Sequence, residues 1–511
     1  MYMSNKLIFT NTIALYLRLL ITLFVSLFTT RIVLKNLGVE DYGLYGTVAG
    51  IIALIAFLQN ALSGATNRFF NVEMVKGDIK HIQKLFSTSL FLHICIAVFI
   101  CLALEIVGMF GLKYYIHIPE GKLVLASNVL HLSIISLFIL ILTIPFEALL
   151  IAKENFKAYA FISIFETFAK LAVAYSLVFF TSERLVYYAF GLLLSTLLTR
   201  SIYVLVTKHL YQEVRLKAGI DKGFLKQIFS FVGWDLYGNF AVILRVHGTT
   251  LIMNNFFGLI MVASIQIGNQ ILAAVSSFSN NFLMAVNPQI MRSYAENDTN
   301  RMNEITIYSS KYSFYLMLLI CVPIIMNINY ILRFWLGNPP QYASMISILT
   351  LLNTLLAIIF NPIITLIHAT GNIRKISFIT GSLIILTLPI TYFLLKNKFD
   401  YKVVYVCFIF CNLFAGLLNL YIAKIQVFNF NVRKFIFNVL LNVLMVASLI
   451  FLVLYQVSKN IIVDNFLMFI LVGLIEGIFA ITCIYLFGIE KKHKIFIIKF
   501  FKSKLKMKNH T

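Results

Sequence analysis

Charged side chains inside apolar segments are the residues of this chain best suited to do chemistry. Arg18 lies in the run NTIALYLRLLIT, and Lys170 follows Glu166 by four residues in another apolar run. Asp235 and Arg245 share the most polar of the apolar segments. A charged group at the centre of a bilayer costs at least about 2.5–3.5 kcal/mol, so such residues usually face a protein interior or a wet cavity. Guanidinium suits bidentate contacts with phosphate. We therefore expect Arg18, Arg245 and Lys170 to bind an anionic group.

The same residues have structural alternatives, which the sequence leaves open. Arg18 could extend to the membrane interface or pair with Asp235. Glu166 and Lys170, at i,i+4 spacing, could neutralise each other on one helix face. Asp235 and Glu166 could also carry a coupling proton or Na⁺, although we favour the interpretation that they balance the charge of the neighbouring bases.

Motifs for other kinds of chemistry are missing from the sequence. It contains no GxxxxGK[ST] phosphate loop, no HExxH pair, no cluster of metal ligands and no nucleophile elbow. The six cysteines all lie in apolar runs without ligand spacing. We therefore expect no enzyme activity, no metal and no cofactor beyond a coupling proton or Na⁺.

The elements that must position these charges are membrane helices. Of 511 residues, 60% are hydrophobic and 12% are charged, whereas soluble proteins carry about 25% charged residues. This composition predicts an all-α polytopic membrane protein. Apolar runs of roughly 20 residues indicate about fourteen transmembrane helices, at 8–34, 44–66, 85–108, 124–146, 158–180, 186–206, 228–256, 259–290, 307–328, 342–367, 376–395, 403–423, 435–456 and 466–488.

The net charge is +22, and the distribution of the basic residues along the chain indicates its orientation in the membrane. With the N-terminus inside, the cytoplasmic segments hold 28 Lys and Arg and the opposite segments hold 10, so both termini are expected in the cytoplasm. Eight of these lysines lie in the tail, which interleaves them with Ile, Phe and Leu. This pattern predicts an amphipathic segment on anionic membrane lipids and not a nucleic-acid partner.

Matching segments indicate an internal duplication. Residues 112–119 read LKYYIHIP and residues 332–339, at an offset of 220, read LRFWLGNP; Gly38 matches Gly258 at the same offset. Four further positions from 145 to 157 match positions from 362 to 374 at an offset of 217. The alternative is that bases and prolines are simply common at span ends. The matches predict an N-lobe at 1–220 (spans 1–6), a C-lobe at 221–430 (spans 7–12), two extra spans at 431–488 and a basic cytoplasmic tail at 489–511.

The segment TTRIVLKNLGVEDYGLYGTVAGI at residues 29–51 resembles the opening of bacterial polysaccharide-export flippases of the Wzx or O-antigen type. Its pattern comprises Arg31, Leu37, Gly38, Tyr42, Gly43, Leu44 and Tyr45. The runs LRFWLG (332–337) and ATGN (369–372) are similar to later features of this family. The wider superfamily is MOP, with MATE drug exporters and MurJ-type lipid II flippases. The resemblance implies two six-helix lobes in a V shape around an alternately opened cavity, and two extra C-terminal helices favour the lipid-linked-sugar branch.

The resemblance also implies a function. The chain would move an undecaprenyl-diphosphate-linked oligosaccharide from the cytoplasmic to the periplasmic leaflet of the bacterial inner membrane, for polysaccharide or O-antigen (lipopolysaccharide) biosynthesis. Glycosyltransferases and a polysaccharide polymerase would be its partners, and the bases named above would hold the diphosphate. One alternative is a MATE-like cation-coupled exporter of small amphipathic compounds, which calls for an acid-dominated cavity. Another is a membrane scaffold that transports nothing, for which no intramembrane charge would matter.

Overall fold

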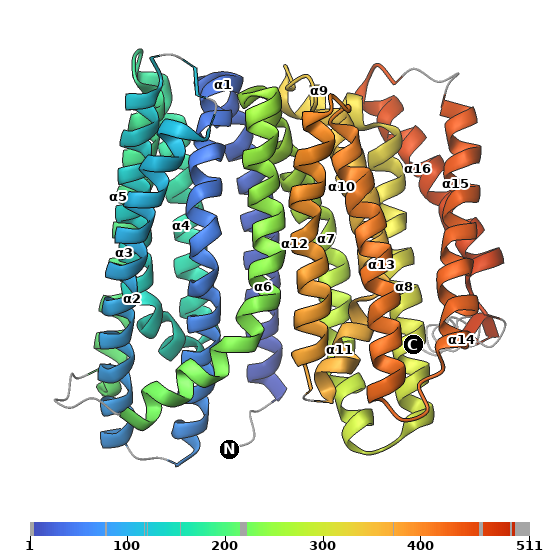
Figure 1. The fold of residues 1–511 in the computed structure, drawn as a ribbon, viewed down its shortest axis with the longest axis horizontal. Helices are drawn as coiled ribbons and strands as arrows, with labels where there is room; N and C mark the ends of the chain where they lie inside the picture. The colour runs from blue at the N-terminus through green and yellow to red at the C-terminus, as the bar shows by residue number, and fades with distance from the viewer. Residues whose placement is uncertain are drawn as a thin grey trace, which may run out of the picture. The chain divides into compact units, whose positions relative to one another are not determined.

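The computed structural model describes residues 5–76, 79–116, 118–119, 121–153, 155–214, 222–370, 372–458, 463–490 and 493–495, in part of α1, α6 and α7 by backbone only. These residues form helices and connecting turns, without strands. The helices are α1 (Asn5–Lys76), α2 (Ile79–Tyr114), α3 (Leu123–Ala152), α4 (Phe156–Ser176), α5 (Arg184–Leu210), α6 (Lys222–Phe257), α7 (Leu259–Ala295), α8 (Thr299–Met326), α9 (Ile328–Leu336), α10 (Ala343–Ile358), α11 (Asn361–Ala369), α12 (Arg374–Lys396), α13 (Lys402–Gln426), α14 (Val432–Phe435), α15 (Asn442–Ser458) and α16 (Phe466–Cys483) (Figure 1).

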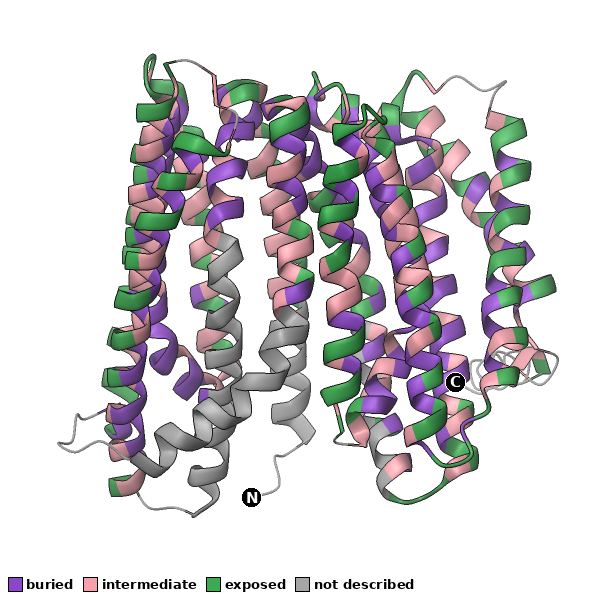
Figure 2. Cartoon of the chain, viewed as in Figure 1, coloured by how far each residue is buried: buried purple, intermediate pink, exposed green. Residues whose placement is uncertain are grey.

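Twelve helical segments in the described part of the chain are long and apolar enough to cross a membrane. The expected all-α polytopic class is confirmed. The two other expected spans, 44–66 and 228–256, lie in α1 and α6, where side chains are described only in part. The outer faces of the helices are apolar: on α2, Phe99 is 71% and Ile106 is 72% exposed, while His93 on the opposite side is buried. Figure 2 shows such exposed positions along the helices. Lipid, and not water, is the solvent that such a surface requires.

Breaks occur inside two of the long helical segments. The boundary expected between the spans 8–34 and 44–66 is confirmed, because α1 comprises two helices that meet at a kink at Gly38, whose φ of 81° and ψ of 170° are not helical and suit glycine. The expected span 342–367 is confirmed as the apolar segment Ala343–Ala369, and a turn at 359–360 divides it into α10 and α11. Pro362 lies in the first turn of α11, where its missing N–H removes no helical hydrogen bond. Most of LRFWLGNP lies in α9, which ends at Leu336 before Gly337.

The first of two compact units comprises residues 1–266, 340–342 and 377–401. Within it α3 packs against α2, α5 and α1, and α1 also packs against α4 and α6. The end of this unit near the α3–α4 turn has an aromatic core, in which Phe86 stacks on Phe70 and meets Phe146 edge-on at 5.1 Å. This aromatic core joins α1, α2 and α3. The helix α5 packs against both α3 and α4, and these three helices carry most of the charged groups described below.

The second unit comprises residues 267–339, 343–376 and 402–511. Within it α10 packs against α13 and α8, and α15 and α16 pack against α8. The buried face of α8 includes Ser309, Ser310 and Ser313, small side chains that let membrane helices approach closely. The lobes expected at 1–220 and 221–430 were defined by an internal duplication in the sequence. The two units are defined by packing contacts, which do not test a duplication. The two lobes therefore stay a prediction.

Helix starts support the internal duplication. The first residues of α2 and α8 are 220 positions apart, and so are those of α3 and α10. The starts of α4 and α12, and of α5 and α13, are both 218 apart. The matched glycines also share a backbone conformation, because φ is 81° at Gly38 and 73° at Gly258. Gly38 kinks α1, and Gly258 separates α6 from α7.

Candidate functional site

Arg18 contacts a tyrosine of a neighbouring helix. Its Nη1 donates a hydrogen bond of 3.0 Å to the hydroxyl of Tyr159 in α4. The guanidinium carbon lies 4.9 Å from the centroid of the same ring, within the range of a cation–π interaction. Its Nε is buried and has no hydrogen-bond partner among the described residues. Arg18 is thus held by a neutral phenol, and its positive charge has no carboxylate partner in the described part of the chain.

A network of ion pairs joins α3, α4 and α5. Arg200 Nη1 lies 2.6 Å from Glu147 Oε2, and Arg200 Nη2 lies 3.9 Å from Glu166 Oε2. Glu166 Oε1 in turn accepts a hydrogen bond of 2.6 Å from Lys170 Nζ. The side chain of Arg200 is 10% exposed. At such depth, two carboxylates beside one guanidinium compensate much of its desolvation cost.

Two tyrosines connect Arg18 with this network. The rings of Tyr159 and Tyr203 lie 6.5 Å apart. The guanidinium of Arg200 lies 5.2 Å from the centroid of Tyr203, which is almost fully buried. Arg18, Arg200 and Lys170 carry three positive charges, and Glu147 and Glu166 carry two negative ones. The cluster, which we call the basic cluster, therefore has an excess of one positive charge and favours an anionic ligand.

A cavity of about 390 Å³ opens beside the basic cluster. Lys170 lines it together with Tyr45 and Tyr188, whose rings meet edge-on at 5.3 Å. Ser133, Ser136 and Thr196 add hydroxyl groups to its wall. The cavity thus offers one base and several hydroxyl groups, which can contact a ligand that is both anionic and polar.

The segment 42–46 has a packing role as well. A Cβ on Gly43 would lie 2.1 Å from the carbonyl oxygen of Leu259, so only glycine permits this approach of α1 to the start of α7. The carbonyl of Tyr42 accepts a hydrogen bond of 2.9 Å from Gln266 Nε2. These contacts fix the backbone that places Tyr45 in the cavity wall. The YGLY motif is therefore explained by helix packing at Gly43 and by cavity lining at Tyr45.

The structure brings together three of the five predicted site residues. Arg18, Glu166 and Lys170 belong to the basic cluster, and the expected pairing of Glu166 with Lys170 is confirmed. Arg245 lies in α6 and is half-buried, and its role stays a prediction. The side chain of Asp235 lies outside the described residues, and so does its expected contact with Arg18.

Sequence reasoning missed two members of the cluster. Arg200 and Glu147 are 53 positions apart, and only the packing of α3 against α5 shows that they pair. Their signal was present in the sequence, because each is a charge within an apolar run and such charges need a partner.

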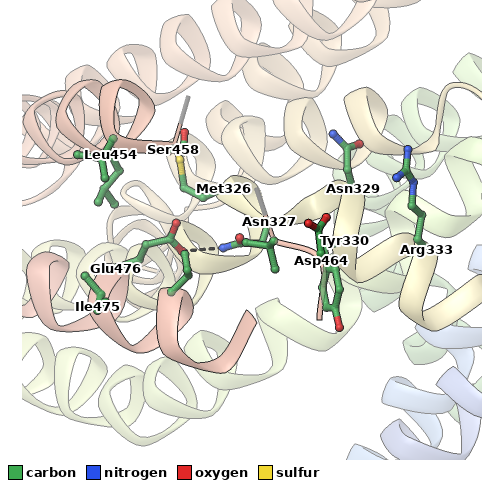
Figure 3. A pocket seen from close by; sticks show the side chains of 13 residues that line it. Met326, Asn327, Asn329, Tyr330, Arg333, Leu454, Ser458, Asp464, Ile475 and Glu476 are labelled. Carbon is green, nitrogen blue, oxygen red and sulfur yellow. Dashed lines mark hydrogen bonds between the residues drawn. The ribbon is translucent and has the colours of Figure 1, made fainter. Parts of the chain in front are cut away.

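A third polar feature lies in the second unit, between α8, α9, α15 and α16 (Figure 3). It is a cavity of about 430 Å³ whose wall includes Arg333 and Asp464. Glu476 is 5% exposed, and its Oε2 accepts a hydrogen bond of 2.7 Å from Asn327 Nδ2. Asn327 stands at the break between α8 and α9 and also donates to the carbonyl of Pro323. This pair therefore ties the break to α16.

The described helices have charged groups in their interior and polar cavities between them. Residues 239–393 match the family model MatE. A search of curated protein sequences found no match. Solved structures with similar folds include a lipid II flippase and MATE family proteins.

One similar structure is the lipid II flippase MurJ in an inward closed conformation, with a TM-score of 0.66 and 16% identity over 93% of this chain and 99% of that one. Another is a multidrug resistance MATE family transporter of the MOP superfamily in an inward-facing conformation, with a TM-score of 0.59 and 15% identity over 82% and 98% of the chains. A MOP superfamily transporter from Pyrococcus furiosus gives 0.57 and 15% over 83% and 96%. The chain thus has the fold of MOP-superfamily transporters.

Proposed function

We propose that this protein is a flippase for a lipid-linked oligosaccharide. It moves an undecaprenyl-diphosphate-linked glycan from the cytoplasmic to the periplasmic leaflet of the bacterial inner membrane by alternating access, for polysaccharide or O-antigen biosynthesis. The observation that carries the proposal is Arg18, whose guanidinium is held by the hydroxyl of Tyr159 and has no carboxylate partner among the described residues. A cation that a neutral group holds in place, inside a membrane, is suited to an anionic headgroup.

The parts of the basic cluster take different roles in this proposal. Arg18 contacts the diphosphate directly, and Tyr159 orients it through one hydrogen bond and its ring. Lys170 adds a second positive charge at the edge of the tyrosine-lined cavity. Arg200 is held by Glu147 and Glu166 and positions the helices around the ligand. Glu166 also limits the positive charge, which lets the headgroup leave again.

Direction of transport needs a source of free energy. Ligand binding alone shifts a conformational equilibrium only by its differential affinity for the two states. Glycosyltransferases would supply the substrate on the cytoplasmic side, and a polymerase would consume it on the other. Coupling to a proton or Na⁺ is the alternative source, with Asp235 as the candidate carrier. The lysine-rich tail, with both termini in the cytoplasm, would lie on anionic lipids.

Deletion of the gene and complementation test the function. Deletion should make a lipid-linked glycan accumulate and should reduce the glycan exported to the surface. Complementation with Arg18→Ala should leave export at least about tenfold lower at normal membrane levels, because an interaction with a charged group contributes about 1.5–3 kcal/mol. Tyr159→Phe, which keeps the ring and removes the hydroxyl, should give a smaller loss.

Arg301→Ala is the matched control, because Arg301 is an exposed arginine in the second unit, in the first turn of α8, and lines none of the cavities described above. It should export normally. Full export by Arg18→Ala would refute the assignment of the diphosphate to this residue. A deletion strain that accumulates no lipid-linked glycan would refute the flippase function as a whole.

A cation-coupled exporter of small amphipathic compounds is the second candidate, and the MatE match over residues 239–393 favours it. Cationic compounds would require an excess of carboxylates in the binding cavity. The basic cluster has the opposite balance. If the deletion strain becomes sensitive to cationic drugs without any change in glycans, this second function replaces the first.

A further inference from the structure

A pocket in the second unit has three amide side chains in its wall. It has a volume of about 340 Å³ and lies between α7 and α11. This volume is within the range of about 300–1,000 Å³ that is typical of small-molecule sites. We call it the amide pocket; its lining consists of Asn280, Leu283, Asn287, Asn361, Ile364, Thr365 and His368.

Asn287 carries an unused hydrogen-bond acceptor in this pocket. Its Oδ1 is buried and finds no donor among the residues that the structure describes. Thr365, by contrast, is occupied, because its hydroxyl donates a hydrogen bond of 3.2 Å to the carbonyl of Asn361. A buried polar atom without a partner is uncommon in folded proteins and calls for an explanation such as a ligand.

The asparagines of α7 recur in the first half of the chain. Asn280 and Asn287 are seven residues apart, two helical turns, and therefore share one face of α7. Asn60 and Asn67 stand at the same spacing 220 positions earlier, in α1. The duplicated chain thus keeps both amides at an offset that also relates the starts of four helices.

The chemistry of the amide pocket suits a neutral ligand rich in hydroxyl groups. Its described lining contains no Asp, Glu, Lys or Arg, so it offers a cationic drug no carboxylate and offers a diphosphate no Lys or Arg. Asparagine both donates and accepts hydrogen bonds, and so does each sugar hydroxyl. We infer that the amide pocket binds hydroxyl groups of the glycan and that Asn287 Oδ1 accepts a hydrogen bond from one of them. This inference rests on the proposed function.

A binding experiment with two probes tests the inference. The first probe is the polyprenyl-diphosphate glycan extracted from deletion cells, in which it should accumulate. The second probe is the same lipid with its sugars removed enzymatically, leaving the polyprenyl diphosphate. Both are titrated into the purified full chain in detergent, and affinity is measured by microscale thermophoresis.

The full chain should bind the glycan probe at least about tenfold more tightly than the trimmed probe, since one good hydrogen bond to a buried group is of that order. Asn287→Leu should remove most of this preference and leave the affinity for the trimmed probe unchanged. Asn280→Ala, a milder variant at an exposed position, should reduce the preference in the same direction. Asn397→Ala, at an exposed turn, is the control and should change neither affinity.

Equal binding of the two probes by the full chain would overturn the inference. A preference that persists in Asn287→Leu, or an equal loss of both affinities, would overturn it too. These outcomes leave the proposed function in place, because that function requires only that binding of the trimmed probe depends on Arg18. Failure of the deletion strain to accumulate any lipid-linked glycan would instead remove the proposed function.

Discussion

The two halves of the chain start their helices at matching positions but stabilise them with different side-chain chemistry. The starts of α2, α3, α4 and α5 recur in α8, α10, α12 and α13 at offsets of 220 or 218. The first half places an ion-pair network among its helices, around Arg200. At offsets of 217 or 218, the second half has apolar residues in place of Glu147, Glu166 and Arg200, namely Ile364, Ile384 and Leu418.

This difference separates the residues that determine the backbone from the side chains that could contact a ligand. The matched backbone depends on glycines and helix caps, such as Gly258 and the side chain of Asp298, which accepts a hydrogen bond from the backbone N–H of Arg301. The side chains on these helices differ between the halves. The basic cluster lies in the first half, and the amide pocket lies in the second. A substrate with a charged and an uncharged part suits such a division.

Breaking the ionic network of the first half should have the largest effect. Arg200→Ala leaves Glu147 and Glu166 without their shared cation, and removing one partner of a buried pair typically costs about 3–5 kcal/mol. We expect the protein to lose much of its thermal stability in detergent, measured by the unfolding midpoint. Leu418→Ala at the matched position of the second half leaves no buried charge unpaired.

The double variant Arg200→Gln with Glu147→Gln serves as the control. It removes one charge of each sign and keeps hydrogen-bonding groups in place, so part of the stability should return. An Arg200→Ala protein as stable as the parent would mean that the ion pairs do not hold α3, α4 and α5 together.

The shared backbone can be tested at the matched glycines. Gly38→Ala and Gly258→Ala each place a Cβ at positive φ, where an added Cβ meets no atom within 4 Å. Both should therefore lose stability through backbone strain alone, by about 1–3 kcal/mol and by similar amounts. Gly477→Ala, which lies in α16 with equally open space and helical backbone, should lose none. Midpoints that differ widely between the two glycine variants would contradict the equivalence of the two positions.

The same contrast explains which features could be predicted from the sequence. Gly38 and Gly258 could be matched because glycine at a helix break leaves a local signal. Arg18, Glu166 and Lys170 could be identified because a charge in an apolar run is costly wherever the helix packs. The pairing of Arg200 with Glu147 could not be identified, because it depends on the packing of α3 against α5. The boundary between the spans 8–34 and 44–66 could be placed near Gly38, where the two helices of α1 meet at a kink, because glycine tolerates a backbone that is not helical.

Replacing Asn287 should raise stability, whereas breaking the ion pairs of Arg200 should lower it. Asn287→Leu removes a buried acceptor that has no donor among the described residues and substitutes an apolar side chain of similar size. Leaving such a group unsatisfied costs about 1–3 kcal/mol, so the variant should be more stable by about 1 kcal/mol in the absence of ligand. Thermal unfolding of the ligand-free protein measures this gain. A clear loss of stability would indicate that Asn287 is a structural residue.

The smallest effect on stability is expected at a position where the first half has an ion pair and the second half has a contact between two aromatic rings. Lys122, just before α3, lies 2.7 Å from Asp41 and 3.0 Å from Glu40. Its match at an offset of 220 is Tyr342, whose ring meets Tyr401 edge-on at 5.1 Å.

Burial opposes the charged form of Lys122, but the hydrogen bonds with Asp41 and Glu40 outweigh it, so the pKa of Lys122 lies above its usual value. A base with a raised pKa contributes stability fully at pH below its unfolded pKa of about 10.4 and loses it as the pH rises through the folded value. The parent should therefore lose up to about 1 kcal/mol more than Lys122→Met between about pH 8 and about pH 11, because partly exposed pairs contribute little. Lys122→Arg keeps its charge throughout this range and should not show the loss at this position. An equal loss of stability at alkaline pH in all three proteins would show that the ion pair at Lys122 contributes nothing measurable. The difference in side-chain chemistry between the two halves would then have no effect on stability at this position.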